Sequence, residues 1–130
     1  MQVEMQLVRI VISETDDRQI IILKEIDGDR HFPIVIGISE AAAIDRRLKK
    51  HPTPRPPTHE LLASVIEKLG GVIERVVIND LRDRTFFALL QVRQGKKVLQ
   101  IDSRPSDAIA LGIGSGVPIF VEEKVLEAVA

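Results

Sequence analysis

The apolar positions in the first 37 residues fall into three short runs with the character of β-strands. Residues 3–13 and 18–26 are rich in Val, Ile, Leu and Met, and the Asp-Gly pair at 27–28 is typical of a two-residue hairpin turn. Residues 29–37 predict a third strand. Pro33 has no N–H to donate, so this strand should lie on a sheet edge or hold Pro33 at an unpaired position.

Two helices and a stiff connector are predicted next. Ser39 fits the N-cap of a helix over 39–50, which starts with an acid and ends with bases. The proline-rich segment 51–58 cannot be helical and predicts an extended connector. Thr58 can cap a second helix that stops at Gly70-Gly71. Its apolar residues recur with the helical period i, i+3, i+4, i+7: Leu62, Val65, Ile66 and Leu69.

The second half of the chain repeats the order of strands and then a helix. Three strands are predicted at 72–79, 85–93 and 96–101, with polar turns around Arg82-Asp83 and Gln94-Gly95. Pro105 suits the first turn of a short helix, Asp107 adds an acid there, and glycines break the helix after Gly112. The last predicted elements are a strand over 117–121 and a helix over 122–129.

The two halves resemble each other at a fixed offset. SEAAAI begins at Ser39 and SDAIAL at Ser106, an offset of 67 (106 minus 39), and the same offset pairs Gly28 with Gly95. An internal duplication of a strand-meander-plus-helix unit is therefore predicted, with halves of about 1–50 and 72–116 joined by the connector and helix at 51–71. Chance similarity between two hairpins that lead into helices is the alternative.

Such a duplication would bring two acidic residues together. If the copies pack about a pseudo-two-fold axis, Glu40 and Asp107 meet among the free N–H groups of two helix N-termini. That place could bind an anion, or a divalent cation held by the carboxylates. Alternatively, each acid only complements the dipole of its own helix.

The length and composition of the chain predict a single compact domain. The chain has 130 residues, 45% of them hydrophobic but only 3% aromatic, which favours β-branched strands packed against alanine-rich helices. The absence of cysteine excludes disulfides, thiolate zinc sites and cysteine nucleophiles. No membrane span or secretion signal is visible, so no membrane partner and a cytoplasmic protein are expected.

The net charge of −1 leaves only a local site for a polyanion. One basic segment could guide a nucleic acid, or could simply complement a helix C-terminus. It comprises Arg46, Arg47, Lys49, Lys50, His51 and Arg55.

The remaining polar residues supply parts for metal-assisted phosphodiester hydrolysis. His59 is the candidate base, with Glu40 and Asp107 beside it as catalytic residues. The candidate ligands for Mg²⁺ or Mn²⁺ are Glu40, Asp80, Asp102 and Asp107. The candidate phosphate-binding residues are Arg55, Arg104, Arg46 and Lys50.

Each of these candidates has a structural alternative. His59 could be an ordinary surface histidine, and Asp102 could form a plain salt bridge with Arg104. Asp80 and Asp83 could serve a turn. Ser106 lacks the G-x-S-x-G context and an evident His-acid partner, so a serine hydrolase is not expected.

Four motifs resemble the bifunctional nuclease domain family of bacteria, archaea and plants: FPIVIGISEAAAI, PRPPTHELL, VVINDLRDRTFFALL and IDSRPSDAIAL. The resemblance covers about residues 5–128, and this sequence departs from the family pattern at Pro57 and Gly112. The positions that match family motifs are Glu40, Arg55, His59, Asp80, Asp102, Arg104, Ser106 and Asp107.

The resemblance implies a single α+β domain, with a mixed β-sheet flanked by helices and a tendency to form homo-oligomers. It also implies degradation of DNA and RNA, as reported for plant members. We therefore predict a low-specificity, divalent-metal-dependent nuclease. The alternative is a non-catalytic oligomeric module that binds a small anion or a protein partner, which the near-zero net charge favours.

Overall fold

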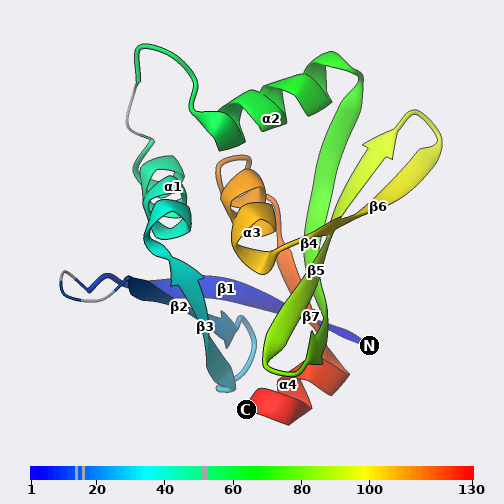
Figure 1. The fold of residues 1–130 in the computed structure, drawn as a ribbon. Coiled ribbons are helices and arrows are strands. Elements are labelled where there is room, and N and C mark those ends of the chain that lie inside the picture. The colour runs from blue at the N-terminus through cyan, green and yellow to red at the C-terminus, as the bar shows by residue number, and fades with distance from the viewer. Residues whose placement is uncertain (14, 16, 51–52) are drawn as a thin grey trace.

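The protein is an α+β domain built on one mixed sheet (Figure 1). The structure, a computed structural model, describes residues 1–13, 15, 17–50 and 53–130. The strands are β1 (Gln2–Val11), β2 (Arg18–Glu25), β3 (His31–Gly37), β4 (Gly71–Arg82), β5 (Thr85–Gln94), β6 (Lys97–Ser103) and β7 (Ile119–Glu122). The helices are α1 (Ile38–Lys49), α2 (Thr58–Lys68), α3 (Pro105–Ile113) and α4 (Glu123–Val129).

The sheet consists of two three-stranded meanders on either side of β7. The strand order is β3-β2-β1-β7-β4-β5-β6. Strand β7 pairs antiparallel with β1 and parallel with β4, whereas all neighbours within each meander are antiparallel. Strands β1 and β4 therefore run in opposite directions, as a two-fold axis normal to the sheet requires.

The two meander-plus-helix units keep the offset read from the sequence. Strands β2 and β5 begin at Arg18 and Thr85, and helices α1 and α3 begin at Ile38 and Pro105, so both pairs are 67 residues apart (85 minus 18, and 105 minus 38). The predicted repetition of a meander followed by a helix is thus present in the fold. Descent of the two units from one duplicated segment stays a prediction.

Helices α1 and α3 lie side by side over one face of the sheet (Figure 1). Four alanines of these helices are buried, and their short side chains let the helices approach each other and the strands closely: Ala41, Ala43, Ala108 and Ala110. Gly112 continues this close approach, because a Cβ atom there would lie 2.9 Å from Cγ2 of Val76 on β4. Helix α2 packs across α3 and β4, and α4 packs against β4 and β7.

The local details differ from prediction at the caps and at two turns. Gly37 and Pro57, not Ser39 and Thr58, are the N-cap residues of α1 and α2, because both are extended and the helices begin directly after them. The predicted two-residue turn at 27–28 is a longer loop between β2 and β3.

The turn between β4 and β5 lies one residue later than predicted, at Asp83 and Arg84, which both have positive φ. Pro33 is on β3, an edge strand, as predicted.

Helix α2 forms where its apolar period predicts a helix, but only part of its apolar stripe is buried. Ile66 packs against the core, whereas Leu62, Val65 and Leu69 are 45%, 43% and 69% exposed. The periodic pattern identified an apolar stripe, yet most of that stripe faces away from this domain. Residues 53–57 form no helix or strand, as predicted for the connector, while positions 51 and 52, including His51, lie outside the described residues.

In the described ranges, none of the helices has the length and apolar character that crossing a membrane requires.

The core under α3 should carry much of the stability. Ile109 on α3 is fully buried, so Ile109→Ala should lower the free energy of unfolding by about 2–5 kcal/mol through lost apolar contact and a cavity. Val35→Ala is the control because Val35 is 57% exposed, and it should cost at most about 0.5 kcal/mol. Urea denaturation followed by circular dichroism measures both; equal losses would contradict this assignment of the core.

Candidate active site

The N-termini of α1 and α3 carry the two acids that the sequence repeat pairs. Glu40 and Asp107 each occupy the third residue of their helix, in its first turn, where a carboxylate complements the helix dipole. The Glu40 side chain folds back over Gly37, and a Cβ atom at position 37 would collide with its carboxylate. The glycine therefore leaves room for Glu40 at the end of the helix.

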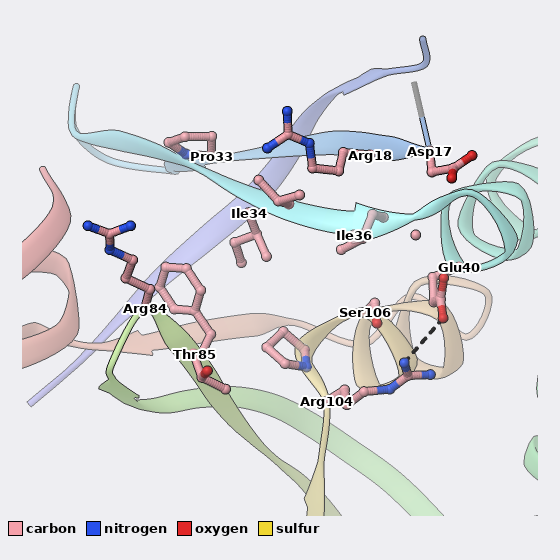
Figure 2. Close-up of a pocket in the computed structure, with 14 residues that line it drawn as sticks. Asp17, Arg18, Pro33, Ile34, Ile36, Glu40, Arg84, Thr85, Arg104 and Ser106 are labelled. Carbon is pink, nitrogen blue, oxygen red and sulfur yellow. Dashed lines mark ion pairs between the residues drawn. The ribbon is translucent and has the colours of Figure 1, made fainter. Parts of the chain in front are cut away.

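Arg104 connects the two acids. It is the N-cap residue of α3, and Nη1 of its guanidinium lies 3.2 Å from Oε1 of Glu40 (Figure 2). Its Nε lies 2.9 Å from Oδ2 of Asp107. Hydrogen bonding and charge from Asp107, followed by the charge of Glu40, raise the pKa of Arg104 above its ordinary value. The expected meeting of Glu40 and Asp107 in one region is thus observed, with a cation between them.

His59 extends this cluster from the first turn of α2. Its Nε2 lies 2.9 Å from Oδ1 of Asp107, and its side chain is only 18% exposed. Partial burial raises the pKa of Asp107, but hydrogen bonds and charges from Arg104 and His59 outweigh it and hold that pKa below its ordinary value. Ionised Asp107 can only accept, so Nε2 of His59 donates and neutral His59 keeps a lone pair on Nδ1.

A cleft of about 480 Å³ opens beside the cluster, between the two meander-plus-helix units (Figure 2). Its volume is within the range of small-molecule sites. Apolar residues of β3 and Phe86 of β5 form part of its wall, and the charged residues that line it are Asp17, Arg18, Glu40, Arg84 and Arg104. Ser106 also lines the cleft; it is 95% buried, and its hydroxyl has no hydrogen-bond partner among the described residues. His59 and Asp107 do not line the cleft.

The four predicted metal ligands do not come together. Asp80 lies on β4, where hydrogen bonds from Arg82 and the Leu81 amide hold its pKa below the ordinary value, and Asp102 lies on the edge strand β6. Within the described ranges, no three His, Asp or Glu side chains form a group that could hold a metal ion. Glu40 and Asp107 are already paired with Arg104, whose positive charge would repel a metal ion bound to these two carboxylates. The cluster in this arrangement does not fit a resident Mg²⁺ or Mn²⁺.

The sequence left structural alternatives open for Asp102, Asp80 and Asp83, and the structure decides them differently. Arg104 pairs with Glu40 and Asp107, and no salt bridge joins it to Asp102. Asp83 does occupy a turn, whereas Asp80 belongs to a strand.

The predicted phosphate-binding residues other than Arg104 lie apart from the cluster. Arg46 and Lys50 are at the C-terminal end of α1, and a helical rise of about 1.5 Å per residue separates Lys50 from Glu40 by roughly 15 Å along the axis. Arg55 is exposed in the connector, where its carbonyl accepts a hydrogen bond from Thr53. The basic segment could therefore contact only a more distant part of a bound chain.

Sequence reasoning missed Arg18 and Arg84 in the cleft wall. The repeat contained the signal, because the offset of 67 pairs position 17 with Arg84 and Arg18 with Thr85, and all four line the cleft. The same offset pairs Gly37 with Arg104 and Glu40 with Asp107. Corresponding positions of the two units thus meet at one place.

The family model and the named relatives that match this chain point to the same protein family. The family model of the bifunctional nuclease domain matches residues 21–130, a span that includes the whole cluster. The chain is 42% identical to an uncharacterized protein of Mycobacterium tuberculosis strain H37Rv over 123 residues, which cover 95% of this chain and 73% of that protein. It is 25% identical to Bifunctional nuclease 1 of Oryza sativa subsp. japonica over 109 residues, which cover 81% of this chain and 33% of the rice protein.

The lowered pKa of Asp107 predicts a pH-dependent contribution to stability. Because the folded-state pKa lies below the ordinary value of 3.8, ionised Asp107 stabilises the fold above that pH and loses this effect as the pH falls through the folded-state value. Asp107→Asn should therefore lower the free energy of unfolding at pH 7, and the difference from wild type should shrink in acid. Asp102→Asn, which removes an acid without an ion pair in the described ranges, is the control. A difference for Asp107→Asn that is constant with pH would contradict the prediction.

Proposed function

Because the chain belongs to the bifunctional nuclease domain family, we propose that it is a nuclease that hydrolyses phosphodiester bonds of DNA and RNA with low specificity, at the charged cluster around Arg104. The observation that carries this proposal is the chain of contacts from Glu40 through Arg104 and Asp107 to His59. It joins a phosphate-binding cation to a histidine oriented by a carboxylate.

The arginines supply the charge that a phosphodiester needs. The Arg104 side chain is 66% exposed, so its guanidinium can contact a phosphate. Glu40 and Asp107 hold the guanidinium in place through Nη1 and Nε. Arg18 and Arg84 add two cations to the cleft wall, and the Ser106 hydroxyl can donate a hydrogen bond to a phosphate oxygen.

His59 is the proposed general base. The hydrogen bond to Asp107 fixes its tautomer, leaving Nδ1 to take a proton from the attacking water. The conjugate acid can then protonate the leaving oxygen of the cleaved strand. Ionised Asp107 stabilises the imidazolium that forms between these two transfers.

No step is assigned to a metal ion, because Arg104 lies between the two carboxylates. The Mg²⁺ or Mn²⁺ dependence predicted from the sequence stays a prediction, and activity with added metal or with a chelator tests it.

The second candidate function is a non-catalytic module that binds a small anion. The net charge of −1 favours it, since the long-range attraction for a polyanion is weak.

The test is cleavage of plasmid DNA and of RNA by purified His59→Gln and wild-type protein. General acid-base catalysis contributes about 10²–10⁴-fold, so His59→Gln should lower kcat/KM by about that factor. His31→Gln is the matched control, because His31 is exposed on β3 and, within the described residues, its imidazole has a hydrogen bond only with the Asp29 carbonyl. It should retain wild-type activity.

Two results would overturn the proposal. Equal cleavage by wild type and His59→Gln would mean a different site or a contaminant. No cleavage of either substrate, with or without Mg²⁺ or Mn²⁺, together with phosphate binding that Arg104→Ala abolishes, would favour the anion-binding module.

A further inference from the structure

The exposed stripe of α2 is the first of two apolar features that no element of the described chain covers. Leu62, Val65 and Leu69 follow one another at helical spacing along α2 and are all exposed. Polar Glu60 lies on another side of the helix, where it lines a pocket with Arg47 and Gly114. Helix α2 is thus amphipathic, with much of its apolar side turned to solvent.

The edge strand β6 is the second feature. Leu99 and Ile101 pair across the sheet with Val92 and Leu90 of β5, which are 4% and 3% exposed, so all four side chains share the helix-bearing face of the sheet. Leu99 and Ile101 are nevertheless 40% and 43% exposed. The helix layer therefore ends before it reaches β6.

The two features adjoin. The Gln94 side chain, at the end of β5, donates a hydrogen bond of 2.9 Å to the carbonyl of Leu69, which ties the C-terminal end of α2 to the β5–β6 hairpin. Figure 1 shows this hairpin extending beyond the rest of the sheet. We name the combined area the α2–β6 surface, made of Leu62, Val65, Leu69, Leu99 and Ile101.

The two edges of the sheet differ in how they are protected. Strand β3 contains Pro33, which removes a backbone donor and is a common device against pairing at an edge. Strand β6 has no proline, and its register with β5 has no bulge from Lys97 to Ser103. Its outer backbone groups therefore form a regular row that can pair with another strand.

We propose that the α2–β6 surface binds a second copy of this chain, with the two β6 strands paired antiparallel about a two-fold axis. The surface is self-complementary, because it offers both a free strand edge and an apolar helix stripe. In a register centred on Leu99, each Leu99 meets its own copy on the helix-bearing face. Ile101 of each copy then lies opposite Lys97 of the other on the same face, and the two α2 stripes flank the floor that these residues form with Leu99.

Charge supports this register. It places Lys96, in the turn that precedes β6, opposite Asp102 of the other copy, on the face away from the helices. Neither Lys96 nor Asp102 takes part in an ion pair among the described residues. Opposite charges directly across an antiparallel pair contribute favourably, whereas a register centred on Gln100 would set Lys96 against Arg104.

The absence of cysteine allows a direct test by cross-linking. Residues opposite each other in antiparallel strands have Cα atoms about 4.5–5.5 Å apart, within the range that a disulfide bridges. Leu99→Cys should therefore form a covalent dimer under mild oxidation. Val35→Cys is the matched control, since Val35 is exposed on the opposite edge strand β3, and it should stay largely monomeric on a denaturing gel.

Sedimentation velocity of the wild type over a range of concentrations completes the test. A reversible dimer is expected, and Val65→Glu should raise its Kd by about tenfold or more, whereas Val35→Glu should not change it. A wild type that remains monomeric at all concentrations would overturn the proposal. So would a dimer in which Leu99→Cys and Val35→Cys cross-link equally, or one that Val65→Glu leaves intact. Circular dichroism confirms that each variant is folded.

Discussion

The close packing of α1 against α3 is the constraint on which the candidate site depends. Buried alanines at 41, 43, 108 and 110 let the two helices approach each other over the sheet, and the strand-to-helix junctions of both meanders then meet at one cleft. Each helix brings an acid in its first turn, and two such carboxylates would repel each other without a cation. Arg104 supplies that cation, so the fold and the charge balance of the site are fixed together.

The sequence allowed much of this arrangement to be predicted, because it depends on local signals. Strand runs, the helix starts near 38 and 105, and the offset of 67 led to the expectation that Glu40 and Asp107 meet. The ion-pair partners of Arg104, Glu40 and Asp107, were not predictable. Asp102 is nearer to Arg104 in sequence, but it lies on the edge strand β6 and does not pair with it. The extent to which α2 is buried was not predictable, because a periodic pattern identifies an apolar stripe without identifying what covers it.

The proposed nuclease site and the proposed contact between copies lie on two separate surfaces of the domain. Three arginines line the cleft between the two units, and one of them, Arg104, is joined through Asp107 to a histidine outside the cleft. The α2–β6 surface lies at the end of the second meander and is apolar. Helix α2 connects the α2–β6 surface to the charged cluster around Arg104, since His59 lies in its first turn and Leu69 follows its last residue. Contact between copies would therefore hold the helix that positions the proposed base.

The most direct test of the central claim is a crystal structure of the protein with a non-hydrolysable phosphorothioate dinucleotide. We expect the bridging phosphate to contact the guanidinium of Arg104, with Nδ1 of His59 facing the side from which water attacks. A dinucleotide bound instead at the C-terminal end of α1, with its phosphate on Arg46 or Lys50 and no contact to Arg104, would contradict this expectation.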